Sequence, residues 1–334
     1  MKKKAVIIIS VFAAVLLATV VMLYSLSSQD DMTVKNPGNP VCMLPITRNP
    51  IHVEFAPGLS FKFDTGSDIT TVTKADLEVL KKYGSKVEKS YYPTIGRNGN
   101  GKMRVTGVRY KVSFPVCEYK FHTDSTGNFI SESTGKIVNR ISDVDVILSE
   151  TGESVLGIDF IERFFIEFLY NENALALHTR MPEGYQKITD IVADRMWFMS
   201  PGWRYYISLR INNINEDFFI DTGIRNAGIK MPMADSGSST EQLTDTTMYS
   251  AKGAFPAKID WHSWLVFGDR AGSYPVTYFD NSEEGYSINP LNMFDQDIVL
   301  DFRGKGLWQR RKPPRPRSGK YRLLTEKKSL CRRG

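Results

Sequence analysis

The chain has 334 residues, of which 42% are hydrophobic and 24% charged, a composition typical of a globular protein long enough for two domains. Its three cysteines, Cys42, Cys117 and Cys331, are too few and too widely spaced for a disulfide framework, and no Cys-x-x-Cys or His-Glu-x-x-His spacing occurs. Thiol and metal chemistry are therefore poor hypotheses, and we expect neither a cofactor nor a metal.

The net charge of +6 is concentrated at one end of the chain. Residues 309–334 contain eleven Lys and Arg and one acidic residue, so the other 308 residues carry 32 basic and 36 acidic side chains. The tail is rich in Pro and Arg without helical or strand periodicity, which predicts disorder. It could contact anionic lipid or nucleic acid, but a solvated extension is the simpler interpretation, and we expect no specific nucleic-acid partner.

The N-terminal segment, residues 1–26, begins Met-Lys-Lys-Lys and continues with a nearly uninterrupted apolar run from Ala5 to Leu26. At ~1.5 Å per residue such a helix spans a ~30 Å hydrocarbon core, and the lysines favour a cytoplasmic N-terminus. A cleaved signal peptide is the alternative, but its apolar run is usually shorter and ends at small residues. We predict a single-pass anchor with the body on the periplasmic or extracellular side, or a secreted body after cleavage, and a polar linker at 27–44.

Residues 45–182 are predicted to form a first, mainly β lobe. Short runs rich in β-branched and aromatic residues alternate with turn residues, and the pattern predicts strands at 51–56, 59–66, 104–116 and 144–149. Residues 74–84 carry Leu77 and Leu80 at helical spacing before a glycine, which predicts a short helix. The Gly- and Asn-rich stretch at 96–103 predicts the tip of a hairpin.

Residues 183–308 repeat the order of these signals and predict a second lobe. Strand-like runs at 203–213 and 216–223 correspond to the first strands of the first lobe. Further along, the segment 154–178 corresponds to 287–308, with 155–160 facing 288–293 and 167–168 facing 301–302. Because weak signals recur in the same order, the sequence predicts a duplicated lobe.

Each predicted lobe carries an Asp-Thr-Gly triplet directly after a strand: Asp64-Thr65-Gly66, followed by Ser67, and Asp221-Thr222-Gly223. A lone triplet of this kind is more often a plain turn. Two triplets, together with Val155-Leu156-Gly157 and Asp159-Phe160 downstream of the first, resemble the aspartic proteases of the retropepsin and pepsin type. The resemblance covers roughly residues 45–308, more specifically in the first half than in the second.

The resemblance implies two β-barrel lobes with an active-site cleft between them, in a monomeric endopeptidase that takes extended peptide substrates. Asp64 and Asp221 would form the catalytic dyad, in which two carboxylates share one proton and activate a water. Thr65 and Thr222 would hydrogen-bond across the lobe interface, and Gly66 and Gly223 would let the backbone approach the carboxylates. Ser67 would donate to the outer oxygen of Asp64. The resemblance also implies a flap over the substrate, with Gly96, Asn98, Gly99, Asn100 and Gly101 as candidates.

Two departures from the family pattern leave other functions open. Ile224 follows the second triplet where a small or hydroxylated residue is common, and Asn289-Pro290 stands where the first lobe has Leu156-Gly157. Proline lacks a backbone N–H, so we expect the second loop to pack differently from the first. A protease-like module that binds peptides or envelope proteins without cleaving them is one alternative, and an unrelated β-rich surface protein with chance triplets is another.

Overall fold

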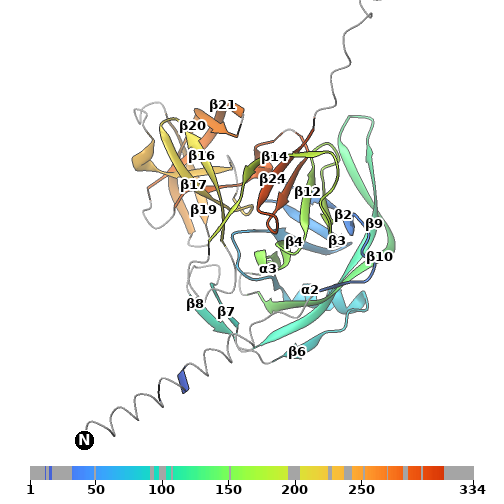
Figure 1. Cartoon of the computed structure of the whole chain (residues 1–334). Helices are drawn as coiled ribbons and strands as arrows, with labels where there is room; N and C mark the ends of the chain where they lie inside the picture. Colours follow the sequence, from blue (N-terminus) through green and yellow to red (C-terminus); the bar gives the residue numbers. More distant parts are fainter. Residues whose placement is uncertain are drawn as a thin grey trace, which may run out of the picture.

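The computed structural model describes residues 12, 15, 16, 32–48, 50–90, 94–97, 103–106, 108–149, 152–194, 204–224, 228–236, 243–250, 253–268, 270–280, 285–294 and 296–311. Over these residues the chain is mainly β, as the sequence predicts (Figure 1). The helical elements are short: α2 (Lys74–Lys82), α3 (Ile158–Ile161), and the 3₁₀ turns η1 (Met233–Asp235) and η3 (Pro290–Asn292).

One large sheet is built mostly from the first half of the chain. Its strands run in the order β14-β24-β23-β12-β13-β2-β3-β4-β11-β5-β10-β9-β6, with β1 paired to β10. Their bounds are β1 (Thr33–Val34), β2 (Cys42–Thr47), β3 (His52–Ala56), β4 (Leu59–Phe63), β5 (Thr71–Val72), β6 (Glu88–Ser90), β9 (Arg109–Thr123), β10 (Phe129–Leu148), β11 (Val155–Leu156), β12 (Phe165–Leu169), β13 (Ala174–His178), β14 (Tyr185–Asp190), β23 (Ile298–Asp301) and β24 (Gly306–Arg310).

A second sheet belongs to the second half of the chain and has the order β15-β16-β17-β22-β18-β21-β20-β19. Its strands are β15 (Val192–Asp194), β16 (Arg204–Ile211), β17 (Ile214–Ile220), β18 (Ile229–Pro232), β19 (Thr244–Ser250), β20 (Gly253–Phe267), β21 (Arg270–Phe279) and β22 (Ser287–Ile288). The strands β7 (Thr94–Arg97) and β8 (Met103–Thr106) form a separate hairpin, which confirms the strand pair around the predicted turn at 96–103.

The strand pairings recur in the two halves of the chain in the same order, as a duplication would require. In the first repeat, β2 to β13, the chain of pairs is β3–β4 antiparallel, β4–β11 parallel, β11–β5 antiparallel, β5–β10 parallel and β10–β9 antiparallel. In the second repeat, β14 to β24, the pairs β16–β17, β17–β22, β22–β18, β18–β21 and β21–β20 follow with the same directions. Both triplets therefore occupy the same position, directly after the second strand of a hairpin.

The two repeats share six strands of the large sheet. The first repeat contributes β2, β12 and β13, the second contributes β14, β23 and β24, and β12 pairs with β23 in antiparallel fashion. Figure 1 shows β12, β14 and β24 between the second sheet and the remaining strands of the first repeat. The strands β13 and β23 are buried along their whole length, so this junction lies in the interior of the protein.

Alternation within β4 sends one face into the core and the other toward the site. Leu59, Phe61 and Phe63 are buried, and Phe61 packs against Phe55 and Phe114 with ring centroids 5.8 and 4.9 Å away. Ser60, Lys62 and Asp64 lie on the opposite face, as the period of a half-buried strand requires. The strand thus carries the first triplet on a rigid aromatic support.

The predicted helix at 74–84 forms as α2. Thr73 caps its N-terminus by accepting a hydrogen bond from the backbone N–H of Asp76, and Leu77 and Leu80 are its buried residues. Gly84 follows the helix with a φ of 76°, the left-handed conformation that glycine adopts without strain. The helix covers the strand that leads into the first triplet.

The segment interpreted as a linker, 27–44, contains parts of the fold. Thr33 and Val34 pair with Ile141 and Ser142 of β10, and β2 begins at Cys42. The pairing is possible because β9 occupies one edge of β10, while on the other edge β5 takes only Ile147 and Leu148. In the described part of the chain, no helix is long and apolar enough to cross a membrane. The predicted anchor, 1–26, lies outside the described residues except for 12, 15 and 16, as do residues 312–334 of the basic tail.

Candidate active site

The backbone holds the two Asp-Thr-Gly loops in equivalent settings. The Asp64 N–H donates to Leu156 O at 3.1 Å, and the Asp221 N–H donates to Ile288 O at 2.8 Å. Leu156 is also the partner of Phe63, as Ile288 is the partner of Ile220. The segment 155–157 therefore corresponds to 287–289, one residue earlier than the alignment expected from sequence, because the strand register and not the similarity of side chains decides the match.

The two threonines join the loops, as the resemblance implies. The Thr65 N–H donates to Thr222 Oγ1 at 3.0 Å, and the Thr222 N–H donates to Thr65 Oγ1 at 3.0 Å. Each hydroxyl then donates across the interface, Thr65 to Ile220 O at 2.8 Å and Thr222 to Phe63 O at 3.0 Å. Both side chains are buried, so these reciprocal bonds hold the two loops in a fixed relation.

The glycines bring each loop against the carboxylate of the other. A Cβ placed on Gly66 would lie 2.8 Å from Asp221 Oδ1 and 3.1 Å from Asp64 Oδ1, and one placed on Gly223 would lie 2.5 Å from Asp64 Oδ2. No side chain fits there, which explains the glycine in both triplets. Each glycine N–H donates to the Oδ1 of its own loop's aspartate, at 3.0 Å for Gly66 and 2.9 Å for Gly223. The structure therefore brings Asp64 and Asp221 together.

The environment of the pair favours a proton on Asp221. Burial and the neighbouring charge of Asp64 raise the pKa of Asp221 to about 6, against the opposing influence of the charges of Lys230 and Lys62 and of the Gly223 N–H. Two carboxylates this close do not ionise independently, so the protons leave the pair in two steps. The pair is thus suited to carry one acidic and one basic carboxyl group in mildly acidic solution.

The expected bond from Ser67 to Asp64 does not form. Ser67 Oγ donates to Ile69 O at 3.0 Å instead. The outer oxygen of Asp64 is taken by Lys62, whose Nζ lies 2.7 Å from Oδ2. The sequence analysis did not single out Lys62, although the alternation of 59–64 already places it on the same face as Asp64, two residues away.

The second loop accommodates Pro290 with contacts that the first loop lacks. Asn289 occupies the position of Gly157 and is fully buried, and its Nδ2 donates to Thr222 O at 3.1 Å. Its Oδ1 accepts from the Leu291 N–H, so it caps η3 while Pro290 takes the first position of that turn, where no N–H is required. The second loop therefore packs differently from the first, as expected, because Asn289 places a buried amide where Gly157 has no room for a side chain. Ile224, which follows the second triplet, is buried in the core.

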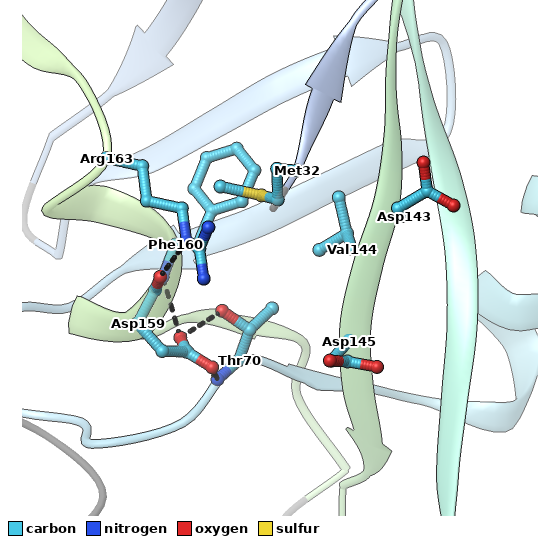
Figure 2. Close-up of a pocket in the computed structure, with 8 residues that line it drawn as sticks. All are labelled: Met32, Thr70, Asp143, Val144, Asp145, Asp159, Phe160 and Arg163. Atoms are coloured by element: carbon cyan, nitrogen blue, oxygen red, sulfur yellow. Dashed lines mark hydrogen bonds between the residues drawn. The ribbon is translucent and has the colours of Figure 1, made fainter. Parts of the chain in front are cut away.

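Asp159 supports the first loop through hydrogen bonds. Its carboxylate accepts from the Thr70 N–H at 2.9 Å and from Thr70 Oγ1 at 2.7 Å, and Thr70 Oγ1 in turn accepts from the Gly157 N–H at 3.1 Å. Figure 2 shows the bonds between Thr70 and Asp159 beside a small pocket, together with the bond that Arg163 donates to Asp159 O at 3.1 Å. The pocket contains neither dyad residue, so it is separate from the candidate site.

The remaining predicted site residues lie at the β7–β8 hairpin. Gly96 is in β7, opposite Arg104. Asn98, Gly99, Asn100 and Gly101 lie outside the described residues. Their assignment to a flap stays a prediction.

The chemistry available to the site is that of two carboxylates and a water. Among the described residues, no three His, Cys, Asp or Glu side chains are grouped so that they could hold a metal ion. A carboxylate on Asp64 could accept a proton from a water, while a protonated Asp221 could donate one to a carbonyl oxygen. The arrangement therefore suits general acid–base chemistry on a substrate laid between the loops.

Comparison with known proteins gives distant structural similarity only. No protein-family model matches the chain, and no curated protein matches it in sequence. Among solved structures, basic 7S globulin from soybean has a TM-score of 0.42 at 9% identity, covering 84% of this chain and 97% of that one. The protein edgp has a TM-score of 0.43 at 9% identity, covering 80% and 94%. Conglutin gamma, a basic 7S globulin from lupine seeds, has a TM-score of 0.41 at 8% identity, covering 84% and 95%. Similarity at this level assigns no function.

Proposed function

We propose that the protein is an aspartic endopeptidase of pepsin-like, two-lobed arrangement in a single chain. The observation that carries the proposal is the pair of Asp-Thr-Gly loops joined by four reciprocal threonine bonds, with each glycine against the other loop's carboxylate. Two unrelated turns would not be expected to combine these contacts with a raised pKa at Asp221. The pepsin type fits better than the retropepsin type because both aspartates lie in one chain.

The reaction follows from the placement of one proton between the two groups. Asp64 accepts a proton from the water as its oxygen attacks the scissile carbonyl carbon, and Asp221 donates its proton to the carbonyl oxygen. Asp64 then donates its proton to the amide nitrogen while Asp221 takes a proton from a hydroxyl of the tetrahedral diol. The carbon–nitrogen bond breaks to give an acid and an amine, and both aspartates return to their starting protonation. During these steps the N–H groups of Gly66 and Gly223 donate hydrogen bonds to Oδ1 of Asp64 and Oδ1 of Asp221, respectively.

The substrate class is an extended peptide or protein segment, which main-chain hydrogen bonds and alternating side-chain contacts would recognise. The hairpin β7–β8 is the candidate flap. With the predicted anchor, the enzyme would act on the extracytoplasmic side of a membrane as a monomer.

The first experiment is cleavage of an unstructured protein mixture from acid to mildly alkaline pH, with product peptides identified by mass spectrometry. The parent, Asp64→Asn and Asp221→Asn are compared, each in the full chain. We expect cleavage by the parent, loss of at least about a thousandfold in each variant, and inhibition by a statine-type transition-state mimic. Activity that survives either substitution would rule out a two-aspartate mechanism.

A second candidate is a binding module that holds peptides or envelope proteins in the same cleft without cleaving them. The ion pair between Lys62 and Asp64 favours this alternative, because the ammonium occupies the oxygen to which we had assigned a hydroxyl donor. A folded parent that binds a peptide mixture but releases no products at any pH would support it. Retention of bound peptide by Asp64→Asn and Asp221→Asn would then separate binding from chemistry.

A further inference from the structure

The ion pair of Lys62 and Asp64 makes the two carboxylates of the dyad unequal. The lysine and aspartate side chains are only 18% and 14% exposed, and the 2.7 Å contact joins Lys62 Nζ to Asp64 Oδ2. Burial alone would lower the pKa of Lys62, but the charge and hydrogen bond of Asp64, with the charges of Asp221 and Glu153, outweigh burial and raise it. The lysine therefore stays charged across the range in which the dyad titrates.

The second repeat has no counterpart of this lysine. Lys62 pairs with Val155, and the equivalent pair in the second repeat is Phe219 with Ser287. Phe219 lies against aromatic and guanidinium groups, with the Tyr206 ring centroid 5.7 Å away and Arg204 Cζ 5.2 Å from its own centroid. The position that carries a cation beside Asp64 thus carries an uncharged ring on the strand that leads to Asp221.

Other charges around the dyad are arranged less directly. Lys230 on β18 is 8% exposed, and its charge lowers the pKa of Asp221. Glu153, ahead of β11, faces Lys62 but is bonded to His52 Nε2 at 2.9 Å. Among the residues that the structure describes, Lys62 is therefore the cation in direct contact with the dyad.

We propose that Lys62 is a positioning residue that holds Asp64 as the carboxylate and thereby places the shared proton on Asp221. For cleavage, this assigns Asp64 as the base and Asp221 as the acid, and in that respect it rests on the proposed function. The proton placement itself belongs to the folded protein and is measurable without turnover. Lys62 also replaces the hydroxyl donor that the sequence suggested at Ser67.

The test compares unfolding free energies from pH 4 to 8 for the full chain. The set is the parent, Asp64→Asn and Asp221→Asn, each alone and combined with Lys62→Met. With Lys62 present, Asp221→Asn should stabilise the fold above about pH 6, because it removes the cost of ionising a group whose pKa is raised to about 6. Asp64→Asn should destabilise it, because the buried ammonium loses its partner.

Removing the lysine should abolish this asymmetry. In the Lys62→Met background, the two aspartate substitutions should change the unfolding free energy in the same direction. The last proton should leave the pair at a pH about one unit or more higher than in the parent. Lys62→Arg should preserve the parent's behaviour. Lys258→Met, which breaks a more exposed contact of 3.5 Å with Asp245, is the matched control and should leave the dyad's titration unchanged. An asymmetry that persists without Lys62 would overturn the proposal.

Cleavage supplies an independent readout. If the proposed activity is present, Lys62→Met should move both limbs of the kcat/KM profile to higher pH by about one unit or more, and Lys62→Arg should not. Unchanged limbs in an active Lys62→Met enzyme would overturn the role of Lys62 and leave the protease assignment intact. Absence of cleavage together with the expected stability pattern would overturn the protease assignment and leave the role of Lys62 intact.

Discussion

At the scale of single residues, the site depends on a few atoms in reciprocal contact. Each triplet threonine uses its hydroxyl oxygen both as acceptor and as donor, and each triplet glycine leaves room that the opposite carboxylate fills. The aspartates are therefore supported mainly by backbone groups, whose positions the strands already fix. Lys62 is the exception, because a flexible side chain sets the charge on one of the two carboxylates.

The threonine bonds should be sensitive to loss of the hydroxyl. In Thr65→Val the N–H of Thr222 and the carbonyl of Ile220 both lose their partner in a buried region, at a cost of about 1–3 kcal/mol for each unsatisfied group. We expect a matching loss in the unfolding free energy measured by chemical denaturation. Thr65→Ser keeps the hydroxyl and is the control; equal destabilisation by both substitutions would contradict this account.

Ser67 offers a complementary prediction, since its hydroxyl does not contact Asp64. Ser67→Ala removes one bond to Ile69 O and should change stability by about 1 kcal/mol or less. The pH at which the dyad titrates should stay at the parent's value when followed by the pH dependence of unfolding. A shift similar to that of Lys62→Met would show that the serine, and not the lysine, controls the dyad in solution.

At the scale of elements, much of the architecture was predictable from residue patterns. The alternation of 59–64, the helix at 74–82 and the repeated order of strands all followed from short-range periodicity, which strongly periodic segments express in sequence. The lysine contact and the off-by-one match of 155–157 with 287–289 did not follow. The contact depends on a rotamer, and the match depends on pairing between strands that are distant in the chain, such as β4 with β11.

The turn after β11 has a strict steric requirement. A Cβ on Gly157 would lie 2.5 Å from the carbonyl carbon of Ile69, a backbone atom that cannot move without displacing the first triplet loop. Gly157→Ala should therefore lower the unfolding free energy by about 1–3 kcal/mol or more, the cost of overpacking. Gly285→Ala is the matched control, because its Cβ would meet nothing within 4 Å. Equal melting temperatures for the two variants would refute the clash.

At the scale of the whole molecule, a buried polar network ties the repeats together. Glu167 of β12 accepts from Tyr185 and from Arg310 at 2.9 Å, and its other oxygen is 2.7 Å from His178 Nε2. Burial alone would raise the pKa of Glu167, but the hydrogen bonds of His178 and Tyr185 and the charges of His178 and Arg310 outweigh burial and lower it. Glu167 and His178 belong to the first repeat, and Tyr185 and Arg310 belong to the second.

This network predicts a distinct dependence of stability on pH. Because folding lowers the pKa of Glu167, its contribution is present above the pKa of the unfolded chain, ~4.3, and is lost as the pH falls through the lower folded value. Glu167→Gln should cost about 3–5 kcal/mol at neutral pH and flatten the acid limb of the stability curve. Glu78→Gln, in an exposed pair with Lys81, should cost less than about 1 kcal/mol. Denaturant unfolding from pH 3 to 7 measures both, and equal costs would contradict the role of the network.

The antiparallel pairing of β12 with β23 has a consequence for how the two repeats came to differ. An antiparallel pair of strands maps onto itself under a two-fold rotation, so two identical copies of one repeat could meet along the same edge. Identical subunits would place the same side chain beside each aspartate. Joined in one chain, the repeats are free to put lysine at position 62 and phenylalanine at position 219. Covalent linkage thereby turns a symmetric pair of acids into one with a defined donor and a defined acceptor.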